Sequence, residues 1–287
     1  MSLTSQLAND TSPVSHWMRA RVRRDAAAAF VRTVNDDLAA RPPLVADRGA
    51  PATVGRAFDL AFRWSRGPLD ARAPLLGARL CATLGWAEAE ALARGLIRVG
   101  DKTRDPGVRL RCAIALSWFE HAYRTGTPPA DLRATFGAPA TREVAWALLR
   151  RVPPGPVADL AALVDTLPTV WADMRDAPFV PNPTFAGSRD VDGADADWIL
   201  GATLWECKVS WRPRPFAREH LLQGIGYALL DYDDRYRLTG LGWYFARQQT
   251  RLVRPLSELL VALCDTGNLR LLRADFRRAI GAGPTDI

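Results

Sequence analysis

The chain has 287 residues, of which 48% are hydrophobic, and a formal net charge of +7. This length and composition suit one large hydrophobic core or two modest ones. No apolar run approaches the roughly 18 residues of a membrane span, and residues 1–24 lack the apolar stretch of a signal peptide. The four cysteines are widely separated and form no CxxC. We therefore expect neither a disulfide framework nor a zinc site. The expected location is the reducing cytoplasm.

The positive charge is unevenly distributed. Basic and acidic residues balance at 14 each from Asp176 onward, so the whole excess lies in residues 1–175. A basic balance fits a polyanionic partner such as nucleic acid, although composition alone is weak evidence. Only two of the 38 basic residues are lysines, Lys102 and Lys208. A lysine kept in an arginine-dominated chain indicates a position that needs a compact ammonium group.

Residues 1–175 are predicted to be helical, because apolar residues recur there at helical spacing between breaks rich in Pro, Gly and Asp. No fixed repeat period is present, which favours a plain helical bundle over a solenoid. The predicted helical stretches are 15–40, 54–64, 75–99, 108–123, 141–151 and 157–174.

The pattern changes after Asp176. Three prolines interrupt an extended segment, and residues 185–188 are predicted to form a short strand. Residues 198–200 and 203–210 are predicted to be two strands joined by a tight turn at Gly201 and Ala202. A helix (218–232), an aromatic-rich strand (240–247) and a further helix (255–264) follow. The order is strand, strand, strand, helix, strand, with a helix expected before it.

Two charged residues lie on one face of the predicted strand 203–210. Side chains alternate along a strand, so Glu206 and Lys208 point the same way. Burying a carboxylate and an ammonium there is costly unless they are paired or hold a metal. An isolated Glu-x-Lys is most often an exposed structural pair, but Asp197 stands immediately before the preceding strand. In a hairpin it would converge with Glu206 on one hard cation, with Lys208 near the attacking water or the phosphate.

Asp197 followed by Glu206-Cys207-Lys208 resembles the bipartite motif of the PD-(D/E)XK nucleases. Gln223 and Tyr227, four apart on one helix face, resemble the QxxxY motif of the RecB-like and lambda-exonuclease-like branch. The resemblance implies an α/β (α+β) restriction-endonuclease-like core, a mixed central sheet flanked by helices, with a large helical N-terminal or inserted region. It also implies Mg²⁺ or Mn²⁺ bound by Asp197 and Glu206, with Gln223 and Tyr227 beside the active site. No Pro precedes Asp197, and the cysteine quartet of iron–sulfur relatives is absent, so no cluster is expected.

The same branch has an upstream Gly followed four residues later by His or an acidic residue, which Gly55 and Asp59 resemble. Asp59 would then complete the metal site, although a solvated helix residue is an equally good interpretation. The resulting organisation is an N-terminal helical segment (1–50), a first core helix (51–66), a helical insertion or domain (67–177) and the nuclease core (178–287). The alternative is two domains divided near Pro178, with another helix completing the core.

Other residues receive simpler interpretations. Asp195 is the main rival of Asp197 as a metal ligand, in an Asp-rich loop that lacks the closing Glu of a calcium loop. The three histidines are expected to be structural or on the surface. Arginines near the motif suit phosphate contacts. They are Arg212, Arg214, Arg218 and Arg247.

The predicted function is a metal-dependent deoxyribonuclease, in a setting such as repair or antiviral defence. DNA is the expected substrate, RNA remains open, and a protein partner of the helical region is plausible. The first alternative is a catalytically degenerate nuclease fold acting as a nucleic-acid-binding or assembly module. The second is a helical scaffold without a nuclease core, which predicts no mixed sheet after residue 180.

Overall fold

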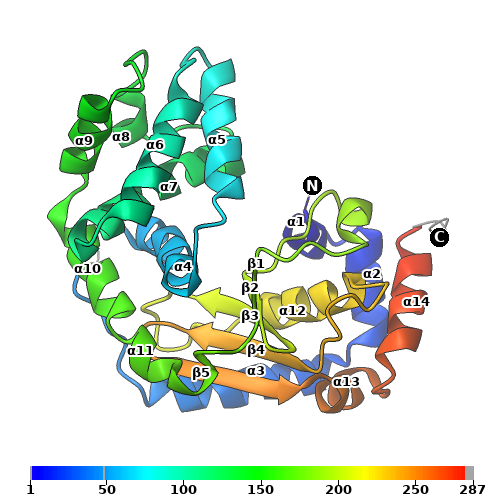
Figure 1. Ribbon diagram of the computed structural model, residues 1–287. Coiled ribbons are helices and arrows are strands. Elements are labelled where there is room, and N and C mark those ends of the chain that lie inside the picture. Colours follow the sequence, from blue (N-terminus) through cyan, green and yellow to red (C-terminus); the bar gives the residue numbers. More distant parts are fainter. Residues whose placement is uncertain (1, 48, 282–287) are drawn as a thin grey trace. The chain divides into compact units, whose positions relative to one another are not determined.

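The computed structural model describes residues 2–47 and 49–281 and has a mixed α/β fold with 58% helix and one five-stranded mixed sheet. The chain divides into two compact units (Figure 1). The sheet unit comprises Met1–Pro43 and Asp173–Ile287, and the helical unit is Leu44–Ala172. Among the described residues, no helix is long and apolar enough to cross a membrane.

The sheet has the strand order β1-β2-β3-β4-β5. Strands β3 and β4 are parallel and the remaining neighbours are antiparallel, with helix α12 (Arg218–Leu230) connecting the parallel pair. The strands are β1 (Phe179–Pro181), β2 (Trp198–Leu200), β3 (Thr203–Lys208), β4 (Gly240–Phe245) and β5 (Thr250–Pro255). The presence of this mixed sheet excludes the second alternative, a helical scaffold that has no mixed sheet after residue 180.

One face of the sheet contributes to the core of the sheet unit. Ile199, Leu204 and Leu241 are buried there together with the apolar residues of α12. Gly224 permits the close approach of α12, because a Cβ at this position would lie 3.0 Å from Leu241. Glu206 and Lys208 follow Leu204 at the two-residue period of β3, so they are on the face that α12 covers.

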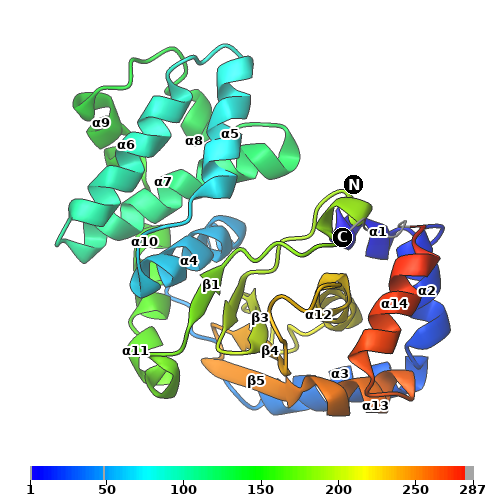
Figure 2. The ribbon, with the colours of Figure 1, turned by 45° about the vertical axis from the view of Figure 1, so that its right-hand side comes forward.

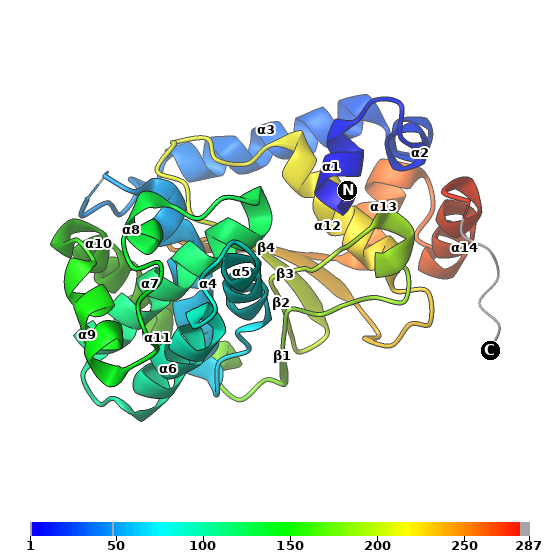
Figure 3. The same cartoon turned by 90° about the horizontal axis from the view of Figure 1, so that it is seen from above.

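Helices from both ends of the chain surround α12 (Figure 2). Helix α1 packs against α12, as Figure 3 also shows, and α3 and α14 contact it too. Buried Asn35 of α3 forms two hydrogen bonds to the backbone of Phe216, just before α12, at 2.7 and 3.0 Å. The helices are α1 (Leu3–Ala8), α2 (Pro13–Arg21), α3 (Arg24–Ala39), α13 (Leu256–Cys264) and α14 (Leu269–Ala279).

The helical unit is built around α7, whose residues 112–120 are all buried. Helices α4, α5 and α6 pack on it. Gly77 of α5 lies so close to α7 that a Cβ would be 1.7 Å from the carbonyl oxygen of Phe119, so this crossing requires glycine. The helices are α4 (Pro51–Arg66), α5 (Arg72–Thr83), α6 (Ala89–Lys102), α7 (Pro106–Thr125), α8 (Ala130–Arg133), α9 (Arg142–Arg151), α10 (Pro154–Val164) and α11 (Leu167–Val170).

Several predicted elements differ from the observed ones. Residues 185–188 are not a strand, and a 3₁₀ helix begins at Ser188. The first strand is instead β1, which ends at Pro181, because an edge strand tolerates proline where a central strand does not. Strand β5 and helix α14 were not predicted. The predicted helix 15–40 is two helices, with Val22 in extended conformation between them, and stretches 75–99 and 157–174 are also divided.

The division into units also differs from the predicted organisation at the N-terminus. Helices α1–α3, predicted as a separate segment, belong to the sheet unit, and α4, predicted as the first core helix, belongs to the helical unit. Within that unit α4 packs on α7 and α10. Its assignment to a nuclease core stays a prediction.

A buried arginine joins α14 to the end of α12. The Arg273 side chain, 7% exposed, donates to Asp231 (2.9 Å), to Asp234 (2.6 Å) and to the carbonyl oxygen of Ala228 (3.0 Å). The Asp231 side chain is fully buried. Burial raises the pKa of Asp231, and the Arg273 charge opposes this rise. The carboxylate therefore depends on Arg273 to remain charged inside the protein.

We predict that Arg273→Met destabilises the protein by about 3–5 kcal/mol, because it leaves the Asp231 carboxylate buried without its partner. The matched control is Arg278→Met on the same helix, whose side chain is 77% exposed and pairs with Asp275. Its effect should stay below about 1 kcal/mol. Urea unfolding followed by circular dichroism measures both, and equal stabilities would refute the structural role of Arg273.

Candidate active site

The site begins with two charged side chains of β3. The Lys208 ammonium donates to Glu206 Oε2 at 2.9 Å, and the Glu206 and Lys208 side chains are 3% and 15% exposed. As the strand alternation predicts, both lie on one face. A buried ion pair is weak evidence for stability, because the loss of hydration of both charges can exceed their mutual attraction. Stability alone therefore does not explain why this ion pair is buried here.

Asp197 lies opposite Glu206. The β2–β3 register pairs Trp198 with Trp205, and extending it by one residue sets Asp197 beside Glu206 with both side chains on the same face. Asp197 Oδ2 accepts a hydrogen bond of 2.6 Å from the backbone N–H of Cys207. This bond fixes the Asp197 carboxylate against β3 next to Glu206.

Helix α12 completes the site from the side. Gln223 Oε1 accepts a hydrogen bond from Lys208 Nζ at 3.3 Å, and Gln223 Nε2 donates to the Tyr227 hydroxyl oxygen at 2.9 Å. Tyr227 is buried and its ring stacks on Phe185, with centroids 5.8 Å apart. Glu206, Lys208, Gln223 and Tyr227 therefore form one continuous series of hydrogen bonds from β3 into α12.

Burial and charge act against each other in this site. Burial raises the pKa of Glu206, an effect that Lys208 opposes and the Asp197 charge reinforces. Burial alone would lower the pKa of Lys208, but Glu206 and Asp197 outweigh it and the pKa is raised. Burial also raises the pKa of Tyr227 well above its ordinary value. Lys208 is thus held as a cation and Tyr227 as a neutral phenol at neutral pH.

The two carboxylates fit a hard divalent cation. Glu206 Oε1 is buried and has no hydrogen-bond partner within the described residues, whereas Oε2 binds Lys208. A buried carboxylate oxygen without a hydrogen bond, next to a second carboxylate, is a costly arrangement that a cation would relieve. Within the described ranges, no group of three or more His, Cys, Asp and Glu residues is placed so that it could hold a metal ion. Mg²⁺ suits such a site, since it keeps several waters and uses one or two protein carboxylates.

Asp59 has a partner of its own. In α4 of the helical unit, its carboxylate accepts two hydrogen bonds from the buried guanidinium of Arg63, one turn further along the helix. This ion pair accounts for an acidic residue on a largely buried helix. The role of Asp59 as a third metal ligand stays a prediction.

Asp195, the rival ligand, is exposed and forms an isolated bridge with Thr184. Its charge contributes to the raised pKa of Tyr227, so it lies in the neighbourhood of the site. Asp197, in contrast, bonds to β3 and raises the pKa of Glu206. This hydrogen bond and this charge effect favour Asp197 over Asp195 as the candidate metal ligand.

The four arginines expected at nucleic acid differ in exposure. Arg212 is exposed, and Arg214 is exposed and paired with Asp36 at 2.9 Å. Arg218, the first residue of α12, is partly buried. Arg247, two residues after β4, is completely buried. Burial argues against a phosphate contact at the surface, and its assignment as a nucleic-acid-binding residue stays a prediction.

Two residues near the site were not singled out from the sequence as part of it. Thr4 of α1 accepts a hydrogen bond of 3.4 Å from Gln223 Nε2, a contact between segments too distant for any local motif to reveal. His220 was expected to be structural or on the surface. Its Nδ1 accepts the Ala217 backbone N–H at the start of α12, and burial and the Lys208 charge lower its pKa to about 4. It is thus a neutral capping residue beside Lys208.

Comparisons of the chain with family models, curated proteins and solved structures gave no match.

We predict that Mn²⁺ binds the metal-free protein at this site and that Glu206→Gln or Asp197→Asn weakens binding at least tenfold, because each removes one charged oxygen ligand. Asp195→Asn is the matched control, with the same chemical change two residues from Asp197. Isothermal titration calorimetry measures all four proteins. An equal loss in Asp195→Asn would move the ligand role to Asp195.

Proposed function

We propose that the sheet unit is a metal-dependent nuclease that hydrolyses phosphodiester bonds of DNA. The observation that carries this proposal is the convergence of Asp197, Glu206 and Lys208 on one face of the sheet. From Lys208, hydrogen bonds continue to Gln223 and on to Tyr227. The sequence motif and this arrangement support the proposal independently. The motif concerns spacing, whereas the hydrogen bonds depend on how β3 and α12 pack.

The proposed roles follow from the charge each residue holds. Asp197 and Glu206 would bind Mg²⁺ or Mn²⁺, which supplies Lewis acidity toward a phosphoryl oxygen and a more acidic bound water. Lys208 is a cation in its resting state, so it serves as a fixed positive charge rather than as a base. In hydrolysis, the water oxygen bonds to phosphorus and releases one proton, the ester P–O bond breaks, and the leaving oxygen takes up one proton. Lys208 stabilises the negative charge that grows on the phosphoryl oxygens.

Gln223 is a positioning residue in this proposal. Its amide accepts from Lys208 and donates to Tyr227, so it fixes the direction of the lysine side chain. Tyr227, buried and neutral, gives that amide a rigid partner. The pair explains why α12 carries two polar side chains on a face that packs against the sheet.

The direct test is cleavage of plasmid, linear duplex and single-stranded DNA with Mg²⁺, Mn²⁺ or EDTA. We predict cleavage with metal only, and loss of at least about 100-fold in rate in Glu206→Gln, because the metal affinity and charge balance both change. Glu258→Gln on α13 is the matched control, since this glutamate is exposed. A folded wild-type protein that binds Mn²⁺ but cleaves none of these substrates would favour the degenerate, binding-only alternative.

Lys208 provides a second test. We predict that Lys208→Ala loses cleavage but keeps Mn²⁺ binding, and that Lys208→Arg is also poor, because a planar guanidinium does not replace a compact ammonium between Glu206 and Gln223. Single-turnover cleavage rates and calorimetry measure the two properties separately. Full activity in Lys208→Arg would contradict the proposed role.

Gln223→Ala tests the positioning role. We predict a roughly tenfold lower single-turnover rate with unchanged Mn²⁺ affinity, since the lysine loses direction but the carboxylates remain. Tyr227→Phe should give a smaller loss in the same direction. Weaker metal binding in Gln223→Ala would indicate that the amide supports the carboxylates instead.

A further inference from the structure

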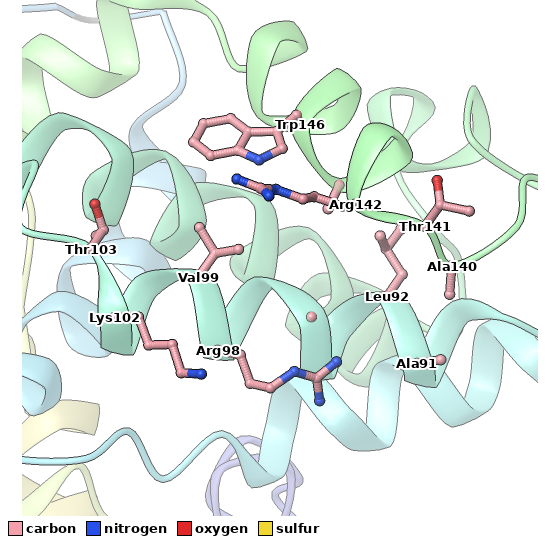
Figure 4. A pocket seen from close by; sticks show the side chains of 12 residues that line it. Ala91, Leu92, Arg98, Val99, Lys102, Thr103, Ala140, Thr141, Arg142 and Trp146 are labelled. Atoms are coloured by element: carbon pink, nitrogen blue, oxygen red, sulfur yellow. The ribbon is translucent and has the colours of Figure 1, made fainter.

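A hollow of about 460 Å³ lies in the helical unit between α6 and α9 (Figure 4). Its volume is within the range of small-ligand sites. Apolar side chains of both helices form much of its wall, among them Leu92, Val99 and Ala145. Gly95 of α6 keeps part of the wall open, because a Cβ there would meet only the end of Arg98 at 3.9 Å.

Three cationic side chains border this hollow. Arg98 and Lys102 are four residues apart on α6 and so share one face. Arg142, the first residue of α9, reaches in from the other side (Figure 4). None of the residues that line the hollow is acidic, and none of these three cations forms an ion pair with a carboxylate among residues 2–47 and 49–281. Three cations without a salt bridge around one hollow attract an anionic ligand.

An aromatic side chain completes the lining. Trp146 lies one turn after Arg142 on the same face of α9, and Figure 4 shows its indole beside the Arg142 guanidinium. The side chain is only partly buried. An accessible aromatic ring among cations is the combination that binds single-stranded nucleic acid, where bases stack on the ring and phosphates contact the cations.

The charge of the whole unit agrees with a polyanionic ligand. Residues 44–172 contain 17 basic and 12 acidic residues, which accounts for five of the seven net positive charges of the chain. A duplex keeps its bases stacked on one another and offers none to an indole, whereas a single strand offers both base and phosphate. An acidic protein segment would use the cations but gain nothing specific from the indole.

We propose that the hollow between α6 and α9 binds a segment of single-stranded nucleic acid, with Arg98, Lys102 and Arg142 at phosphates and Trp146 stacking on a base. This assigns a binding role to the helical unit that the nuclease site does not require. It is tested with metal chelated, so its outcome does not depend on whether the sheet unit cleaves DNA.

The experiment uses the full chain in EDTA and a fluorescein-labelled oligothymidylate of about 12 nucleotides, with binding followed by fluorescence anisotropy. Replacing Arg98, Lys102 and Arg142 together by Ala should weaken binding at least tenfold. It should also reduce the slope of log K against log salt concentration by about 2 in magnitude. The reason is that each phosphate contact contributes roughly 0.7 to this slope for single strands. The matched control replaces Arg72, Arg133 and Arg151, which are exposed in the same unit but do not line the hollow. It removes the same charge and should change binding less than threefold.

Variants of Trp146 separate the contribution of base stacking from the contribution of charge. Trp146→Leu should weaken binding several-fold without changing the salt dependence, and Trp146→Phe should recover most of the loss. Equal weakening in the two triple variants would overturn the proposal, as would unchanged binding in Trp146→Leu. Equally strong binding of the matching duplex, or equally strong competition by a glutamate decapeptide, would also overturn it, and the latter would assign the hollow to an acidic protein segment.

Discussion

The contact on which the site depends is the ion pair between Glu206 and Lys208, buried where β3 meets α12. Each charge alone would be too costly in this environment, and together they still leave one carboxylate oxygen without a partner. Other polar groups lie next to this carboxylate oxygen and to Lys208. Asp197 brings a second carboxylate and Gln223 fixes the direction of the lysine, so two carboxylates share one ammonium group.

This arrangement needs a rigid support, which comes from helices at the N-terminal end of the chain. Asn35 of α3 binds the backbone of Phe216 immediately before α12, and Thr4 of α1 reaches Gln223. On the other side, Arg273 of α14 ties the C-terminal end of α12 through Ala228 and Asp231. Helix α12 is therefore held at both ends, which keeps Gln223 and Tyr227 at hydrogen-bonding distance from β3.

Local sequence patterns predicted the parts of this site that depend on short spacing. The shared face of Glu206 and Lys208 follows from strand alternation, and the one-turn separation of Gln223 and Tyr227 follows from the helix period. The turn at Gly201 followed from its composition, and Gly201 adopts a positive φ of 65°. These features need only a few neighbouring residues.

The features that the sequence did not reveal depend on residues far apart in the chain. Nothing local to Asn35 or Thr4 indicates that they support α12, and nothing local to Arg247 indicates its burial. Strand β1 was obscured by prolines that an edge position tolerates, and β5 by its arginines, whose side chains an edge strand can leave partly exposed. The largest feature of this kind is that α1–α3 pack with strands and helices from which they are far separated in the sequence.

That separation has a consequence for synthesis of the chain. Helices α1–α3 are made before the residues that bury their apolar side chains, such as Phe276 against Trp17 and Phe216 against Phe30, which come much later in the chain. The helical unit is a continuous segment with its own core, so it can fold on the ribosome while the N-terminal helices still expose Trp17, Met18 and Val34 to solvent. Closing contacts of such long sequence separation is slow. A finished unit beside an exposed apolar segment is the kind of intermediate that chaperones protect from aggregation.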